Sequence, residues 1–269
     1  MAIKLVAMDM DDTLLNAALE ISPHNAATIA RAVEQGVLVT IATGRMYCST
    51  APYARKLGLD VPLIVYNGAM IKSGISGEVL YHKLIAEELS REVLAFFRQH
   101  GWYVQSYVDD TLYVEQLNAT AKWYADFARV EAIALGEPFY TSLGAPTKIL
   151  SLASAEQVQV MYEAVCREFG ERLFVTISKP EFLEMVHPEV SKGRALAFLA
   201  AKYGICQEEV LAIGDSGNDL DMIAYAGLGV AMGNAAAAIK QAADVITGAN
   251  TEDGVALAIE KYVLGKDID

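Results

Sequence analysis

Apolar runs and amphipathic segments alternate along the first quarter of the chain. Residues 5–8, 37–42 and 62–66 are short apolar runs, each followed at once by polar or glycine residues. Between the first two runs, Ser22-Pro23 offers a capping hydroxyl and then proline at a first helical position. A second helix is expected between the second and third runs, ending near residue 57. This β-α-β-α-β order predicts a parallel, doubly wound sheet whose strands are buried on both faces.

The pattern changes after residue 68. Short segments at 69–72 and 79–82 predict a hairpin, and a helix is expected over 87–100. The pattern beyond predicts strands at 102–107, 111–115, 147–153, 173–178 and 182–186, and helices at 118–128 and 155–169, with no assignment for 130–146. This mixed order is typical of an α+β domain with one open sheet.

From residue 191 the first pattern returns. It predicts helices at 191–203, 218–226, 235–242 and 253–263, and strands at 210–213, 229–232 and 245–246. The predicted fold class is therefore α/β, a Rossmann-like doubly wound parallel-sheet core with an inserted α+β domain. The core is predicted to comprise residues 1–83 and 189–269, and the insert residues 84–188.

Composition narrows the possible partners. The chain has 269 residues, a formal charge of −13 and 54% apolar residues. Such acidity argues against nucleic acid or an anionic membrane as a partner, because both select a basic face. The three cysteines show no CxxC pattern, and no apolar run is long enough to span a membrane, so a cytoplasmic protein is expected. An anionic substrate would need local positive charge, from a metal ion, a lysine or a helix N-terminus.

Acidic residues follow the first apolar run. Asp9 and Asp11 are two positions apart, so they project to the same side at the carboxyl end of the predicted strand. Close carboxylates repel each other unless a cation lies between them, and hard oxygen ligands favour Mg²⁺. The alternative is an acidic turn in which Asp12 or Thr13 caps a helix, which explains one of the aspartates but not all three.

Two further positions suit an anion. Thr43 offers a hydroxyl and Gly44 a bare backbone N–H at the end of the second run, although a simple tight turn explains them equally well. Lys192 follows the expected cap Ser191, in a helical turn where a cation opposes the helix dipole. Such a lysine is either a solvated surface residue or one that points at a bound anion.

The strand predicted at 210–213 also ends in acidic residues. Asp215 is a candidate third metal carboxylate or a helix N-cap. Asn218 could donate a hydrogen bond to a phosphate oxygen, or only cap a helix. Asp219 could orient a metal-bound water, or simply be an acid in the first helical turn.

Together these groups predict phosphoryl transfer through an aspartyl phosphate. In this hypothesis Asp9 attacks phosphorus, and Asp11 protonates the leaving oxygen and later takes a proton from water. Mg²⁺, Lys192 and the Thr43 and Gly44 donors would offset the charge of the phosphoryl oxygens.

Four segments carry a family resemblance. D-M-D-D-T-L-L, A-T-G-R, V-S-K-G and G-D-S-G-N-D-L-D-M-I resemble, in order, the four motifs of the haloacid dehalogenase superfamily. The stretch A-G-L-G-V-A-M-G-N-A at 226–235 and the position of the insert are similar to its Cof-type subfamily IIB of sugar-phosphate phosphatases. The resemblance covers nearly the whole chain.

The resemblance implies a role for each matching residue. Asp9 would be nucleophile and metal ligand, Asp11 the acid/base and a metal ligand through its backbone carbonyl, and Met10 a backbone N–H donor to phosphate. Thr43, Gly44, Lys192 and Asn218 would bind phosphate, and Asp215 would bind the metal. Asp12 stands where the family often has glycine.

The interpretation is a Mg²⁺-dependent phosphatase of a small phosphorylated metabolite, with the insert as a cap. A closing cap excludes water and large substrates, which favours a sugar phosphate or phosphorylated cofactor. Specificity is expected from 107–110 or 178–182, and the protein is expected to be a monomer or small homo-oligomer. A phosphomutase that uses the same aspartyl phosphate and a non-enzymatic phospho-receiver remain the alternatives.

Overall fold

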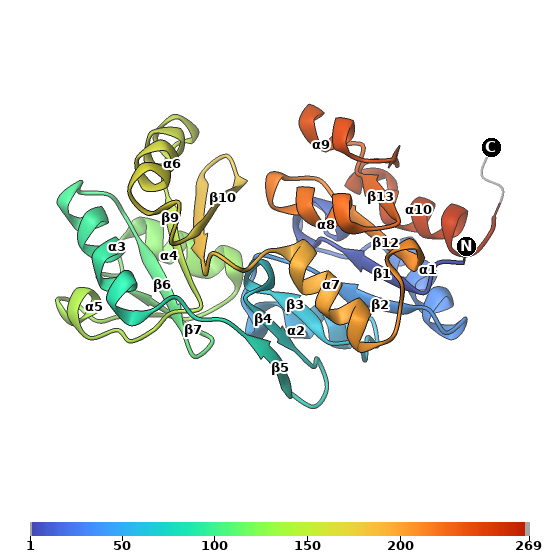
Figure 1. Cartoon of the computed structure of the whole chain (residues 1–269), viewed down its shortest axis with the longest axis horizontal. Coiled ribbons are helices and arrows are strands. Elements are labelled where there is room, and N and C mark those ends of the chain that lie inside the picture. Colours follow the sequence, from blue (N-terminus) through green and yellow to red (C-terminus); the bar gives the residue numbers. More distant parts are fainter. Residues whose placement is uncertain (1, 267–269) are drawn as a thin grey trace. The chain divides into compact units, whose positions relative to one another are not determined.

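Strand β1 (Leu5–Met8) lies in the middle of a parallel sheet, and all four of its residues are fully buried. It pairs with β2 (Leu38–Ile41) on one side and with β12 (Val210–Gly214) on the other. Beyond β12 lie β13 (Leu228–Ala231) and β14 (Val245–Ile246), in the order β14-β13-β12-β1-β2. Figure 1 labels β13, β12, β1 and β2 of this sheet. The predicted α/β fold with a parallel-sheet core is confirmed.

The strand order reverses between β1 and β12. From β1 the chain proceeds to β2 on one side, and it returns much later to β12, β13 and β14 on the other side. Open α/β sheets bind ligands at such a switch point, outside the carboxyl ends of the strands. Asp9 and Asp215 each follow one of these two strands directly.

The computed structural model describes residues 2–266, which form two compact units. The first contains the chain up to Gly44, Ala51–Leu80 and the chain from Ser191 onward, and the second contains Arg45–Thr50 and Tyr81–Val190. Helix α2 (Tyr47–Lys56) and strand β5 (Val79–His82) cross from one unit to the other.

Helices accompany the parallel sheet in two packed pairs, α1 (Pro23–Glu34) with α10 (Gly254–Tyr262) and α7 (Lys192–Lys202) with α8 (Leu220–Tyr225). Helix α1 begins as its sequence predicts, because the Ser22 hydroxyl accepts the Asn25 N–H at 3.0 Å and Pro23 follows. In chain order the helices of this unit are α1 (Pro23–Glu34), α7 (Lys192–Lys202), α8 (Leu220–Tyr225), α9 (Ala237–Ala242) and α10 (Gly254–Tyr262), beside the part of α2 described above. Within residues 2–266, none of the helices combines the length and the apolar character needed to cross a bilayer.

Strand β3 (Leu63–Val65) differs from the prediction of a third regular core strand. A single parallel bridge between Ala42 and Ile64 joins it to the end of β2. Its other partner is β4 (Met70–Lys72), which is antiparallel and continues to β5. The difference arises because the chain turns back on itself at 66–68, so β3 pairs with the segment that follows it.

The second unit is a sheet of order β10-β11-β9-β6-β7-β8 with helices. Figure 1 labels β10, β9, β6 and β7 of this sheet. Its core is formed by apolar side chains such as Phe97 on α3, Ile149 on β9 and Val165 on α6. The elements are α3 (Glu87–Gln99), β6 (Gln105–Val108), β7 (Thr111–Val114), α4 (Ala119–Ala128), β8 (Ala132–Ala134), α5 (Pro138–Thr141), β9 (Lys148–Leu152), α6 (Ala155–Phe169), β10 (Phe174–Lys179) and β11 (Phe182–Val186). Strand β8 and helix α5 thus fill the stretch that the sequence pattern left unassigned.

Strand β6 starts three residues later than predicted. The Trp102 N–H still bonds to the Phe97 carbonyl at 3.0 Å and closes the end of α3. The Trp102 ring stacks on His100 with ring centroids 4.4 Å apart. Trp102 therefore belongs to the helix end and not to the sheet.

The two segments expected to set specificity lie at opposite ends of this sheet. Strands β6, β9, β11 and β10 are successive antiparallel neighbours, so β6 and β10 run in opposite directions. Residues 107–110 include the carboxyl end of β6 and the turn after it, and 178–182 include the carboxyl end of β10 and the turn after it. The two segments are therefore alternatives, because they do not share one end of the sheet.

Candidate active site

Asp9 is fixed by the sheet itself. Its backbone N–H donates to the Ile213 carbonyl of β12 at 2.9 Å, and the residue is 5% exposed. The chain then forms a single kinked helical turn over Met10–Leu14. Within it Met10 is buried, and Asp11 has extended backbone angles.

Asp12 adopts a left-handed backbone conformation, with φ of 59°. Its carbonyl accepts a hydrogen bond from the Asn234 side-chain amide at 2.8 Å. Left-handed angles cost glycine nothing and aspartate comparatively little. The conformation gives a physical reason why glycine suits this position and why aspartate is tolerated there.

Lys192, the first residue of α7, points inward. Its side chain is 0% exposed, and its ammonium donates to Asp9 Oδ1 at 2.5 Å and to Asp219 Oδ1 at 2.6 Å. Burial alone would lower the pKa of the ammonium, but Asp219 and Asp9 raise it above its ordinary value. The lysine therefore stays charged, and its two carboxylate partners offset its unfavourable position at a helix start.

Asp219 binds several groups at once. The sequence alone left open whether Asp219 has a role in the site or is only an acid in a first helical turn. While Oδ1 binds Lys192, Oδ2 accepts the backbone N–H groups of Asp215 and Ser216, both at 3.0 Å. The side chain also lies so close to Gly214 that a Cβ there would come within 2.5 Å of the Asp219 Cβ. In the sequence, the feature that indicates this close approach is Gly214, the glycine directly after the strand predicted at 210–213.

Asp215 is bound by a residue that sequence reasoning missed as a site residue. The Thr13 hydroxyl donates to Asp215 Oδ1 at 2.8 Å, and Thr13 is fully buried. Burial and then the charge of Asp219 raise the pKa of Asp215 to about 7, although the Thr13 hydrogen bond opposes this. Asp215 is therefore partly protonated near neutral pH when no cation is bound.

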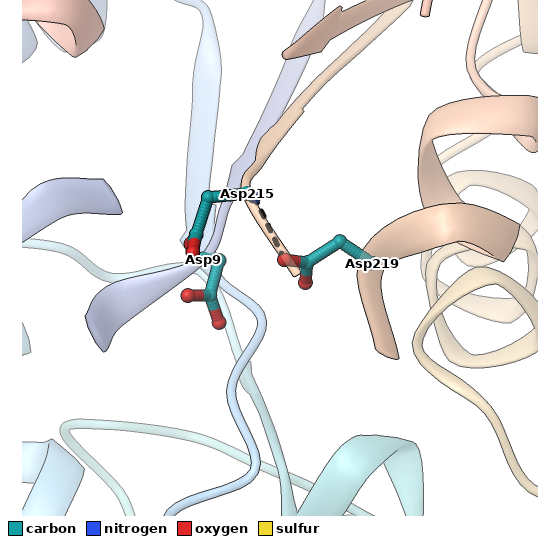
Figure 2. Close-up of side chains that lie close together, drawn as sticks. All are labelled: Asp9, Asp215 and Asp219. Atoms are coloured by element: carbon teal, nitrogen blue, oxygen red, sulfur yellow. Dashed lines mark hydrogen bonds between the residues drawn. The ribbon is translucent and has the colours of Figure 1, made fainter. Parts of the chain in front are cut away.

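Asp9, Asp215 and Asp219 gather their carboxylates at one point (Figure 2). One ligand atom from each lies within 4.8 Å of the others. Burial raises the pKa of Asp9 well above its ordinary value; Lys192 opposes the rise, and the other two aspartates add to it. The three carboxylates and one ammonium carry formal charges of −3 and +1, so a divalent cation would neutralise the cluster.

This cluster differs in membership from the predicted ligand set, Asp9, Asp11 and Asp215. Asp219 contributes a side-chain oxygen to it. The role predicted for Asp11 uses its backbone carbonyl, which a group of side-chain oxygens does not include.

Thr43, Gly44 and Asn218 lie on neighbouring segments. The Ala42 N–H donates to the Met8 carbonyl at 2.9 Å, which places Thr43 and Gly44 just beyond β2, beside β1. The Asn218 amide is held at both ends: its nitrogen donates to Asn67 Oδ1 at 3.0 Å, and its oxygen accepts the Ser216 hydroxyl at 2.7 Å.

Comparison with known proteins decides the family. The family model of haloacid dehalogenase-like hydrolases matches residues 6–259. The chain belongs to the haloacid dehalogenase-like hydrolases. Within this family it is 34% identical to a 5-amino-6-(5-phospho-D-ribitylamino)uracil phosphatase of Bacillus subtilis, over 97% of this chain and 96% of the relative.

Solved structures of haloacid dehalogenase-like hydrolases agree. A family member from Bacteroides thetaiotaomicron has a TM-score of 0.86 and 34% identity, covering 96% of this chain and 99% of that one. A subclass IIB sugar phosphatase has a TM-score of 0.83 and 25% identity, covering 96% and 98%. These findings confirm the predicted family, its Cof-type branch and the assignment as an enzyme of the phosphatase type.

Proposed function

We propose that the protein is a Mg²⁺-dependent phosphatase that hydrolyses a small phosphorylated metabolite through an aspartyl phosphate on Asp9. One observation carries the proposal: a buried carboxylate ends the central strand at the switch point of the sheet, held by a buried lysine within a cluster of acidic oxygens. With a divalent cation to offset the negative charge of the cluster, Lys192 and the cation would supply the positive charge that a transferring phosphoryl group needs, in a chain that is acidic overall.

Asp9 is the proposed nucleophile. An Asp9 oxygen attacks phosphorus while the bond between phosphorus and the ester oxygen breaks. Asp11 gives its proton to the departing alcohol, and then takes a proton from the water that attacks the aspartyl phosphate. The bond between phosphorus and the Asp9 oxygen breaks in this second step, which releases inorganic phosphate and restores the Asp9 carboxylate and the protonated Asp11.

Lys192 serves charge and position in both steps. Its ammonium lies at 2.5 Å from Asp9 Oδ1, so it favours the ionised form of the nucleophile and can move toward phosphoryl oxygens as the Asp9 charge is used. The second contact, to Asp219, holds the ammonium in place meanwhile. Thr43, Gly44, Met10 and Asn218 are the proposed donors to the remaining phosphoryl oxygens.

The acidic cluster suits a divalent cation. Asp9 and Asp215 would hold Mg²⁺ with the Asp11 carbonyl, and Asp219 would support the site through Lys192 and the 215–216 backbone. A bound Mg²⁺ supplies positive charge to the transferring phosphoryl group and keeps the ligand carboxylates ionised. The raised pKa values of Asp9 and Asp215 are what such a cation would correct.

The second unit is the proposed cap, and it selects a small substrate. The relatives named above act, by their names, on a phosphorylated ribitylaminouracil and on sugar phosphates. Both are phosphate monoesters of small polyhydroxylated molecules, which supports a sugar phosphate or phosphorylated cofactor here. Alanine substitutions in 107–110 and, separately, in 178–182 test which end of the cap sheet sets the preference.

Release of inorganic phosphate from a panel of sugar phosphates, nucleotides and phosphorylated cofactors tests the proposal. The expected result is release that requires Mg²⁺ and is abolished by Asp9→Asn. Release that survives Asp9→Asn would show that another group is the nucleophile. No release, with Asp9 nevertheless phosphorylated, would favour a mutase or a phospho-receiver instead.

A further inference from the structure

The turn Tyr66-Asn67-Gly68 joins β3 to β4 with three successive left-handed residues. Their φ angles are 54°, 56° and 93°. Left-handed angles are ordinary for glycine and tolerable for asparagine, but unfavourable for a tyrosine. Strain of this kind persists only where the surroundings enforce it, and it gathers at functional sites.

The surroundings of this turn belong to the candidate active site. The Asn67 N–H donates to the Thr43 carbonyl at 3.0 Å. Gly68 lies against the backbone of Ser191, the N-cap of α7, so closely that a Cβ on Gly68 would come within 2.3 Å of the Ser191 carbonyl oxygen. The turn therefore touches the segment of Thr43 and the helix start that carries Lys192.

The Asn67 side chain reaches a third segment. It is 1% exposed, and its Oδ1 accepts the Asn218 Nδ2–H at 3.0 Å. The Ser216 hydroxyl donates to the oxygen of the same Asn218 amide at 2.7 Å. With its nitrogen toward Asn67 Oδ1 and its oxygen toward the Ser216 hydroxyl, the Asn218 amide has a second N–H to offer.

We infer that Asn67 is a positioning residue, which orients the Asn218 amide so that its second N–H can donate to the substrate phosphate. The inference rests on the proposed function, because it assigns Asn67 to the same phosphate site. The strained turn supplies what the amide needs: a buried acceptor at a fixed place, with its backbone tied to Thr43 and packed on Ser191.

Asn67→Gly separates this role from a purely structural one. Glycine accepts the left-handed backbone without strain and keeps the N–H to Thr43, but it removes the acceptor of Asn218. The melting temperature should stay within about 3 °C of wild type, while kcat/KM should fall roughly ten- to hundredfold. Arg129→Gly is the matched control, since Arg129 is also left-handed, with φ of 55°, but is exposed at the end of α4; its kcat/KM should not change.

A double-mutant cycle with Asn218→Ala tests the route of the effect. If Asn67 acts through Asn218, Asn67→Gly should change kcat and KM in the same proportion as Asn218→Ala does. In the Asn218→Ala background, Asn67→Gly should lower kcat/KM by less than about twofold more. Full additivity, or an Asn67→Gly protein as active as Arg129→Gly, would overturn the inference alone. An Asn67→Gly protein that fails to fold would also overturn it, by giving the side chain a structural role, whereas an inactive wild type would overturn the proposed function on which it rests.

Discussion

Replacing Asp215 with asparagine should make the metal-free protein more stable at neutral pH, although it removes a proposed metal ligand. The folded state raises the pKa of Asp215 from its ordinary 3.8 to about 7. A raised carboxyl pKa contributes stability that is fully present below the ordinary value and is lost as the pH rises through the folded value. Asparagine keeps an oxygen for the Thr13 hydroxyl but never ionises, so it escapes this loss.

The expected size follows from the two pKa values. Between pH 5 and pH 8, the linkage relation gives a loss of roughly 2–3 kcal/mol for wild type that Asp215→Asn does not suffer. At about 2–4 °C per kcal/mol for a unit of this size, the melting temperature of the variant should gain roughly 4–12 °C on wild type over that range. Mg²⁺ at a hundred times its Kd should remove most of this advantage, since such a ligand stabilises wild type by about 2.7 kcal/mol and the variant by less.

Thermal unfolding in chelator, recorded at half-unit steps from pH 5 to pH 8, measures this difference. Asp219→Asn is the control, because it makes the same chemical change in the same cluster but breaks the ion pair with Lys192. It should lower stability by about 1–3 kcal/mol. An Asp215→Asn advantage that is absent at pH 8, or equally large at pH 5, would refute the electrostatic reasoning.

Three further predictions concern other charged or titratable groups. Lys192→Met removes the ammonium between Asp9 and Asp219, so urea unfolding in chelator should show a loss of about 3–5 kcal/mol, and an unchanged midpoint would contradict the buried ion pairs. Burial and then the charge of Asp110 raise the pKa of Cys48 to about 12. In a variant with serine at the other two cysteines, Cys48 should therefore react with a disulfide reagent at least roughly tenfold more slowly than a free thiol. Asp110→Asn should speed this reaction. The hydrogen bond from Lys266 lowers the pKa of Glu260, burial opposes this, and His24 lowers the pKa further. The stability difference between wild type and Glu260→Gln should therefore be present above the ordinary pKa of 4.5 and shrink as the pH falls through the lowered pKa. A stability difference that does not depend on pH would exclude this linkage.

The sequence was most informative where a local pattern determines the structure. The run at 5–8 is apolar at every position, which indicates a strand buried on both faces, and that strand places Asp9 at the switch point. Lys192 stood out because a cation at a helix start is unfavourable by itself, and its two carboxylate partners lie in the structure at hydrogen-bonding distance.

Other features depend on partners that are distant in the sequence. Asp219 looked like an ordinary acid of a first helical turn, because its bond to Lys192 spans 27 positions and needs the α7–α8 packing. The Thr13 hydroxyl donates a hydrogen bond to Asp215, 202 positions away, and the local pattern does not distinguish this role from that of a helix cap. The pairing of β3 with β4 was missed because the strand at 69–72 was expected to pair only with 79–82, and the local pattern at Asn67-Gly68 does not show that the chain reverses there.

Trapping the phosphoenzyme tests the central proposal most directly. The protein would be mixed with Mg²⁺ and a phosphate ester that it hydrolyses, quenched in acid and reduced with borohydride. Borohydride converts an aspartyl phosphate to homoserine, and the modified peptides would be identified by mass spectrometry. We predict homoserine at position 9 in wild type and none in Asp9→Asn. Homoserine at another aspartate, or full turnover with no trapped residue under conditions that accumulate the intermediate, would contradict the proposed mechanism.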